Sequence, residues 1–199
     1  MKVIRLHTNP DKYSSNSYLV MGAFNTIDDV NAVIDTGYDG YISKHIDTIY
    51  TGVGKKPLDK IVITHNHFDH NGGIKELKEK YGAKAYAFIP GNGIDYILQE
   101  GEEIKLADCY FTVIHTPGHS QDSICLYCKK EGILFSGDTT IRVYANDSSY
   151  TPDYVESIEK LARIKINVIY PGHGEPYKDN PELIIRNSLR ILTNNKTNN

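Results

Sequence analysis

The chain has 199 residues, which is enough for one sizeable hydrophobic core and too few for two ordinary domains with a linker. Hydrophobic residues make up 40% and charged residues 24%, as in globular proteins, so a disordered or fibrous chain is excluded. The net charge of -3 gives no general attraction to nucleic acid, and no run approaches the ~18 apolar residues of a membrane span. Arg5 and His7 interrupt the N-terminal apolar stretch, so it does not read as a secretory signal, and we expect a cytoplasmic protein.

Strand-like and helix-like segments alternate along the first half of the chain. Apolar runs predict strands at 17–21, 32–34, 61–63 and 84–88. Ile42, Ile46 and Ile49 recur at helical spacing, which predicts a helix over 43–50 with Ser43 as its cap. A second helix is predicted over 74–81, where Gly82 would end it.

The second half of the chain alternates in the same way. Strands are predicted at 109–114, 124–127, 133–135 and 167–170. Thr151-Pro152 and Asn180-Pro181 each place a capping residue before a proline, which predicts helices running to about Arg163 and about Leu192. No linker-like or repeated segment divides the sequence, so we expect a single domain over residues 1–199.

The three cysteines are Cys109, Cys125 and Cys128, and an odd number does not indicate a disulfide framework. Cys125 and Cys128 form one C-x-x-C inside a predicted strand. A structural zinc site would need a second such pair or two suitably spaced histidines. We therefore expect these cysteines to be buried strand residues.

The most informative segment is His65-Asn66-His67-Phe68-Asp69-His70, which directly follows a predicted buried strand. Imidazole and carboxylate are standard ligands of zinc and related divalent ions. His65 and His67 alternate on an extended backbone and so point to one side, while Asp69 and His70 come as the chain turns into a helix. The segment therefore predicts part of a metal site at the end of a strand.

Three later strands end in the same manner, with a glycine and a ligand-type residue in the turn. These turns are His115-Thr116-Pro117-Gly118-His119, Ser136-Gly137-Asp138 and Pro171-Gly172-His173-Gly174. Glycine permits a tight turn, and four such strand ends are hard to explain by packing alone. One polar cluster at a sheet edge accounts for all four, and its size indicates two ions rather than one.

Taken together, residues 64–70, 116–119, 135–139 and 171–174 resemble the metal motifs of the metallo-β-lactamase-fold superfamily, in the same order, and Val33-Ile34-Asp35-Thr36-Gly37 resembles its early turn. The resemblance implies an α/β (α+β) fold, a four-layer αββα sandwich with both metals at one edge. By position, His65, His67 and His119 would hold the first ion and Asp69, His70 and His173 the second, with Asp138 bridging them. Asp35 would either orient a ligand or be an ordinary turn residue.

This ligand set implies a dinuclear metal-dependent hydrolase, in which a metal-bound hydroxide attacks a thioester or related acyl carbonyl. Asp69 would orient the hydroxide and take its proton. The two divalent ions are expected to be zinc, with iron or manganese as alternatives. The positive charge of two divalent ions exceeds the negative charge of two carboxylates and a hydroxide, which leaves the site with a charge of about +1. We therefore expect a small anionic or thioester substrate.

Three features resemble the glyoxalase II (hydroxyacylglutathione hydrolase) branch: residues 116–119, residues 136–139 and the predicted helix around 154–161. Classical enzymes of that branch have a C-terminal helical domain that binds glutathione, whereas one helix is predicted here after His173. A smaller thioester or another acyl substrate therefore stays open, as do glutathione recognition, the native metal and the oligomeric state. Arg142 and Tyr144 would either contact substrate or belong to a solvated loop.

The same fold also carries other functions, which are the alternatives to this interpretation. A persulfide dioxygenase would use one iron, whereas Asp69, His70 and His173 favour two ions. A nuclease would need an RNA-binding insertion for which 199 residues leave little room. A lactonase is not separated from a thioesterase by the sequence. A non-catalytic binding relative would show lost ligands, and every expected position is filled here.

Overall fold

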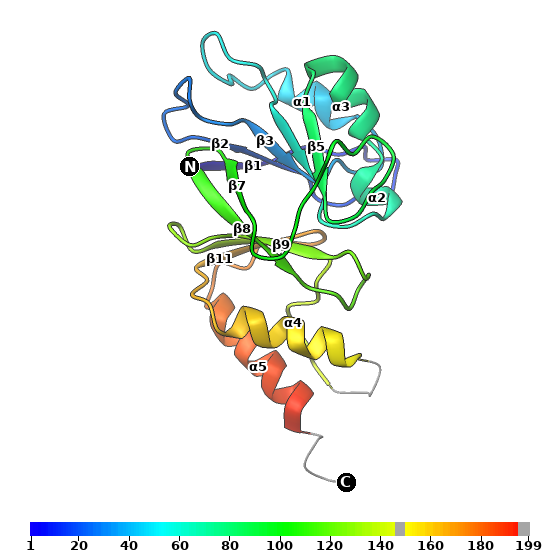
Figure 1. The fold of residues 1–199 in the computed structure, drawn as a ribbon, viewed down its shortest axis with the longest axis vertical. Coiled ribbons are helices and arrows are strands. Elements are labelled where there is room, and N and C mark those ends of the chain that lie inside the picture. Colours follow the sequence, from blue (N-terminus) through cyan, green and yellow to red (C-terminus); the bar gives the residue numbers. More distant parts are fainter. Residues whose placement is uncertain (146–149, 195–199) are drawn as a thin grey trace.

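The computed structural model describes residues 1–145 and 150–194. Two β-sheets stack face to face, and helices cover the outer face of each (Figure 1). The first sheet has the order β1-β2-β3-β4-β5-β6 and the second the order β11-β10-β9-β8-β7. The strands of the first sheet are β1 (Lys2–Arg5), β2 (Tyr18–Met21), β3 (Ala32–Ile34), β4 (Lys60–Val62), β5 (Lys84–Ala87) and β6 (Tyr96–Ile97). Those of the second are β7 (Glu103–Leu106), β8 (Cys109–His115), β9 (Ile124–Cys128), β10 (Ile133–Gly137) and β11 (Val168–Pro171).

Three apolar layers hold these elements together. Val20 and Phe111 belong to the layer between the two sheets. Leu19, one residue earlier on β2, points to the opposite face and packs beneath α1 (Ile42–Ile46) and α3 (Ile74–Tyr81). The third layer lies between the second sheet and the helices α4 (Pro152–Ala162) and α5 (Pro181–Thr193), and includes Leu134 and Ile158. The predicted four-layer αββα sandwich is therefore confirmed.

The sheet topology places the ligand-bearing turns at one end of the sandwich. β3 and β4 pair in parallel, as do β10 and β11, so their carboxyl ends lie at the same edge. At this edge the two sheets are joined by a hydrogen bond of 2.9 Å from Ile124 N to Thr64 O. Residues that follow β4, β8, β10 and β11 consequently meet although they are far apart in sequence.

Two helix predictions are confirmed. α3 spans the predicted residues, and Gly82 follows it at φ +65°, a left-handed conformation that favours glycine. Thr151 caps α4 through its hydroxyl, which accepts a hydrogen bond of 3.3 Å from Tyr154 N. The three cysteines are free and buried, as expected from their strand positions.

Two capping predictions were wrong. Ser43 lies inside α1 rather than before it, because its hydroxyl donates to Glu76 of α3 at 2.9 Å, and the helix ends at Ile46. Asn180 makes no side-chain cap and adopts φ +49°, so the carbonyl of Asn180 rather than its side chain begins α5. The short strands β1, β6 and β7 were not predicted, because their few residues carry no sustained apolar pattern.

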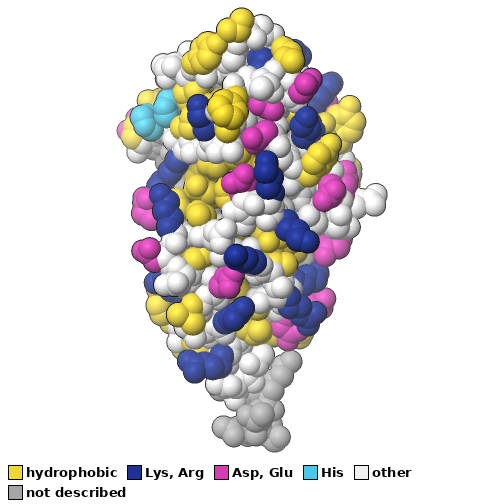
Figure 2. All heavy atoms as spheres, turned by 90° about the vertical axis from the view of Figure 1, so that its left-hand side faces the viewer, with side chains coloured by type: hydrophobic (Ala, Val, Ile, Leu, Met, Phe, Trp, Pro, Cys, Tyr) yellow, Lys and Arg dark blue, Asp and Glu magenta, His cyan; other side chains and the backbone are white. Residues whose placement is uncertain are grey.

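The surface shows charges of both signs. On the face in Figure 2, the described Lys and Arg side chains alternate with Asp and Glu rather than gathering into one basic field. Among the described residues, no helix has the length and apolar character needed to cross a bilayer.

Candidate metal centre

The segment after β4 delivers four ligand-type side chains to one place. The chain bends at Thr64 and His65, is extended at His67 with φ -75° and ψ 149°, and enters the short helix α2 (Phe68–Asn71) directly after it. His65 and His70 are fully buried and Asp69 is nearly so, whereas His67 is exposed. The change from extended chain to helix therefore turns these four side chains toward a common space, as predicted.

One half of the cluster consists of three imidazoles. His67 Nδ1 lies 3.0 Å from His65 Nε2 and 3.0 Å from His119 Nε2. Zinc–nitrogen bonds of about 2.0–2.1 Å in a tetrahedron put ligand atoms about 3.3 Å apart, close to what is seen. Burial lowers the pKa of His65 to about 3, with His70 adding to the effect, so His65 is neutral and offers a lone pair at pH 7.

The other half joins Asp69, His70 and His173. Asp69 Oδ2 lies 3.1 Å from His173 Nε2 and 3.7 Å from His70 Nε2. His173 comes from the turn after β11 and is partly exposed at the rim, while His70 is at the buried floor. Three ligand atoms from two distant segments thus converge within reach of one ion.

Asp138 lies between the two halves. Its Oδ1 is 3.3 Å from His70 Nε2, and its Oδ2 is 3.5 Å from both His119 Nε2 and His173 Nε2. Burial raises the pKa of Asp138, but the neighbouring imidazoles of His70, His173 and His65 outweigh it and lower that pKa to about 2. Asp138 is therefore a carboxylate whose Oδ2 faces both parts of the cluster and whose Oδ1 faces His70.

Asp35 orients two of these histidines from behind. Its Oδ2 accepts from His70 Nδ1 at 2.8 Å and from the Thr64 hydroxyl at 2.8 Å. Because the Thr64 proton goes to Asp35, the Thr64 oxygen is free to accept from His65 Nδ1 at 3.2 Å. Both imidazoles thereby hold a proton on Nδ1 and direct Nε2, the atom that would bind a metal, into the cluster. Of the two roles considered for Asp35, the structure shows the orienting one.

A second support was missed by sequence reasoning. Asn16 Nδ2 donates to Pro171 O at 3.0 Å and to Gly174 O at 2.9 Å, so it spans the turn that holds His173. Tyr18 donates its hydroxyl proton to Pro171 O at 2.8 Å. These residues lie in and next to an early strand, about 155 positions before the turn. No local pattern in the sequence signals a contact over that separation.

Two glycines in the predicted turns are required by close approach. A Cβ on Gly172 would lie 2.2 Å from Asp138 Oδ1 and 2.8 Å from His70 Cε1. A Cβ on Gly137 would lie 2.5 Å from Thr64 Oγ1, and Gly137 also has φ +48°. The ligand-bearing turns can therefore pack this tightly only because both positions lack a side chain.

The donor set fits metal ions. In the described part of the chain, His70 Nε2 and Asp138 Oδ1 are buried without a hydrogen-bond partner. The three converging nitrogens of His65, His67 and His119 likewise lack enough protons to satisfy one another. Buried polar atoms left in this way call for a missing partner, and a divalent cation suits imidazole and carboxylate together. The clusters could therefore hold metal ions.

A cavity of about 340 Å³ opens beside the cluster, and His119, Asp138 and His173 form part of its wall. Arg142 and Tyr144 line it as well, and the Arg142 guanidinium lies 5.4 Å from the ring centre of Tyr177. Ser188 fixes this stretch, because its hydroxyl donates to Ile141 O and accepts from Val143 N. Ile141 and Val143 are buried, and the residues that alternate with them, Arg142 and Tyr144, are exposed and within reach of a molecule in the cavity.

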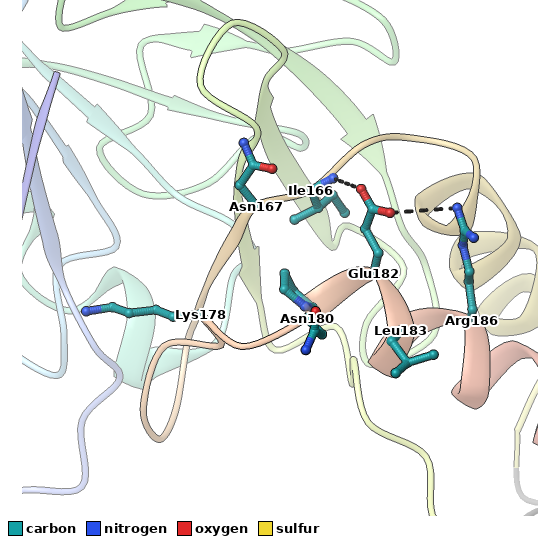
Figure 3. A pocket seen from close by; sticks show the side chains of 8 residues that line it. Ile166, Asn167, Lys178, Asn180, Glu182, Leu183 and Arg186 are labelled. Carbon is teal, nitrogen blue, oxygen red and sulfur yellow. Dashed lines mark hydrogen bonds and ion pairs between the residues drawn. The ribbon is translucent and has the colours of Figure 1, made fainter.

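A hollow at the start of α5 lacks this chemistry. Figure 3 shows Glu182 engaged on both sides, by Ile166 N at 3.1 Å and by Arg186 at 3.7 Å. Its lining includes no histidine and no second carboxylate among the described residues. The cluster at the sheet edge is therefore the candidate centre.

The family signature matches residues 10–91 and 88–173 and is described as the metallo-beta-lactamase superfamily. The chain belongs to this superfamily. Its fold agrees: the structure named ETHE1 from Myxococcus xanthus superposes with a TM-score of 0.74 at 19% identity, covering 96% of this chain and 85% of that one. The two chains therefore share a fold.

Two curated relatives have names that bear on chemistry. The acyl-coenzyme A thioesterase MBLAC2 of Gallus gallus is 32% identical over 162 residues, covering 61% of this chain and 58% of the relative. A probable hydroxyacylglutathione hydrolase of Schizosaccharomyces pombe is 32% identical over 123 residues, covering 58% of this chain and 48% of the relative. This chain therefore spans about half the length of these two relatives, and both relatives are hydrolases by name.

Proposed function

We propose that the protein is a dinuclear metal-dependent hydrolase that cleaves a thioester or a related acyl substrate. The observation that carries the proposal is the convergence of seven ligand-type side chains, with Asp138 within 3.5 Å of His119 in one group and of His70 and His173 in the other. His65, His67 and His119 would hold one ion, and Asp69, His70 and His173 the other, with Asp138 between them. Bound there, the two ions would activate a water molecule and polarise the substrate carbonyl.

The side chains of the protein supply the remaining chemistry. Asp69 lies at the centre of its group, 3.1 Å from His173 Nε2, where its carboxylate can orient the attacking water and accept its proton. Thr64 and Asp35 hold the imidazoles so that their lone pairs stay directed inward. The site is thus organised before substrate arrives, which lowers the cost of reaching the transition state.

The cavity supports an acyl substrate with an anionic or hydrogen-bonding group. Arg142 offers a positive charge, and Tyr144 and Tyr177 offer phenolic hydroxyls along its wall. The names of the two curated relatives, an acyl-coenzyme A thioesterase and a probable hydroxyacylglutathione hydrolase, support the same substrate class. Arg142 is therefore our candidate for the group that selects a negatively charged substrate.

The test is metal analysis of protein purified without added metal, followed by a screen of thioesters, lactones, β-lactams and phosphodiesters. We expect about two divalent ions per chain and hydrolysis of thioesters. His67→Ala should lose one ion and the activity. The matched control is His45→Ala. His45 lies in α1, stacks on His7 and is outside the cluster. About one iron and no hydrolysis would contradict the proposal, as would full activity of His67→Ala.

A further inference from the structure

Tyr13 lies against the rim of the metal centre although it belongs to none of its motifs. Its ring stacks on the His173 imidazole, with centroids 5.1 Å apart and planes inclined by 19°. Its hydroxyl oxygen lies 3.5 Å from His173 Nε2. Among the described residues, no other group is within hydrogen-bond distance of that hydroxyl, and 68% of the residue is exposed. The phenol is therefore available to a molecule that enters the site.

The fold attaches the segment next to Tyr13 to both of the turns that supply the group Asp69, His70 and His173. Ser15 N donates to Asp69 O at 3.1 Å, and Asn16 N donates to Gly172 O at 2.6 Å. These bonds attach the chain two and three residues after Tyr13 to the turns that carry Asp69 and His173. The position of the phenol beside His173 thus follows from backbone anchoring.

The environment of Tyr13 indicates which substrate atom it would meet. The cavity that would take one part of the substrate is lined by His119, Asp138, His173 and the residues around Arg142, and Tyr13 is outside that lining. A substrate with its acyl part in the cavity would leave its other part toward Asp69, His173 and Tyr13. In a thioester, that other part would carry the sulfur that leaves.

Resting on that proposed function, we propose that Tyr13 is a catalytic residue that donates a hydrogen bond to the leaving atom of the substrate. The water oxygen forms the new bond to the acyl carbon, and its proton passes to Asp69. The bond from the acyl carbon to sulfur then breaks, and sulfur departs with the electron pair as a thiolate. The Tyr13 hydroxyl keeps its proton, which an ordinary phenol retains at neutral pH, and stabilises the new charge.

The deciding variant is Tyr13→Phe, which keeps the stacked ring and removes the donor. The probes are acetyl thioesters of 4-nitrothiophenol, thiophenol and an alkyl thiol, in which the leaving thiolate becomes progressively more basic. We expect kcat to be nearly unchanged with 4-nitrothiophenol and to fall about tenfold to a hundredfold with the alkyl thiol, because a more basic anion depends more on a donor. The metal content should equal that of the wild type.

Two further measurements separate this role from structural support of His173. Binding of thiophenol as product, followed by calorimetry, should weaken about tenfold in Tyr13→Phe. Tyr38→Phe is the control, because Tyr38 is also exposed but its ring packs on Phe68 at 5.8 Å. It should keep the wild-type dependence on the leaving thiol.

The outcomes distinguish this proposal from the one on which it rests. An equal loss of kcat with all three thioesters, or a loss of metal from Tyr13→Phe, would show structural support and overturn the catalytic role. Unchanged kinetics in Tyr13→Phe would overturn it as well. A wild-type protein that cleaves none of the three thioesters would instead refute the proposed function, and this proposal with it.

Discussion

The carboxylate of Asp35 accepts a hydrogen bond from the His70 imidazole, with 2.8 Å between Oδ2 and Nδ1. The same oxygen accepts from Thr64, which in turn accepts from His65. One buried carboxylate therefore sets the orientation of a histidine in each half of the candidate centre. Asp35 adopts φ +56°, in the left-handed region where aspartate and asparagine are more easily accommodated than most residues.

Asp35→Asn should weaken metal binding about tenfold to a hundredfold, because the neutral amide loses the charge that makes both imidazoles better ligands. Competition with a chromophoric chelator measures the change. Asp59→Asn is the matched control, because Asp59 accepts a similar bond from Asn31 N at 2.8 Å away from the centre. Equal metal affinity in the two variants would contradict the orienting role.

Metal loading should release a proton from His70. Burial lowers the pKa of His70, but the charges of Asp35 and Asp138 and the hydrogen bond to Asp35 outweigh it and raise that pKa to about 10 in the metal-free protein. At pH 8 the imidazole is therefore protonated, and an ion at Nε2 must displace that proton. Calorimetric titration in phosphate and in Tris should show the release, and Asp35→Asn should release less. Equal binding heats in the two buffers would rule it out.

The same pKa shift gives a pH dependence of stability for the metal-free protein. The folded pKa of about 10 exceeds the ordinary value of 6.5, so folding favours the protonated imidazole. This contribution to the free energy of unfolding is fully present below pH 6.5 and disappears as the pH rises through 10. Denaturant titrations between pH 6.5 and 10 should show a smaller decrease for His70→Ala than for the wild type.

Gly172→Ala should abolish metal binding, because its Cβ would enter the space of Asp138 Oδ1 and His70 Cε1. Gly174→Ala in the same turn is the control. Its Cβ would meet nothing within 4 Å, although φ is +81°, so it should cost about 1–2 kcal/mol of stability and keep its metal. Metal content and thermal denaturation of both variants test the prediction. Full metal content in Gly172→Ala would show that the turn can move aside.

Asn16→Ala should weaken binding of the ion at Asp69, His70 and His173 more than binding of the other ion. The substitution removes the two donors that hold the His173 turn and should cost about 1–3 kcal/mol of stability. Stepwise metal titration separates the two ions. Asn31→Ala removes two equivalent bonds, to Thr51 O and Lys56 O at 2.9 Å each, without touching the site. If both variants bind metal alike, Asn16 contributes stability alone.

Local pattern was sufficient for the elements that carry the ligands. The apolar run before His65, the glycine after Tyr81 and the proline after Thr151 each affect only the backbone next to them. The structure has β4, the end of α3 and the start of α4 at these three places. Short-range signals failed where a long-range partner competed. Glu76 draws the Ser43 hydroxyl away from a capping role, which residues 43–50 alone do not reveal.

The sequence alone indicated the candidate ligands, because histidine or aspartate follows four predicted strands: His65, His67, Asp69, His70, His119, Asp138 and His173. Their meeting in one place depends on parallel pairing of β3 with β4 and of β10 with β11, which puts the strand ends at a common edge. Only the tertiary structure decided the supporting contacts. Thr64 and Asp35 set the tautomers, Asn16 spans the His173 turn, and Tyr13 lies on His173, because these contacts join segments that no sequence periodicity relates.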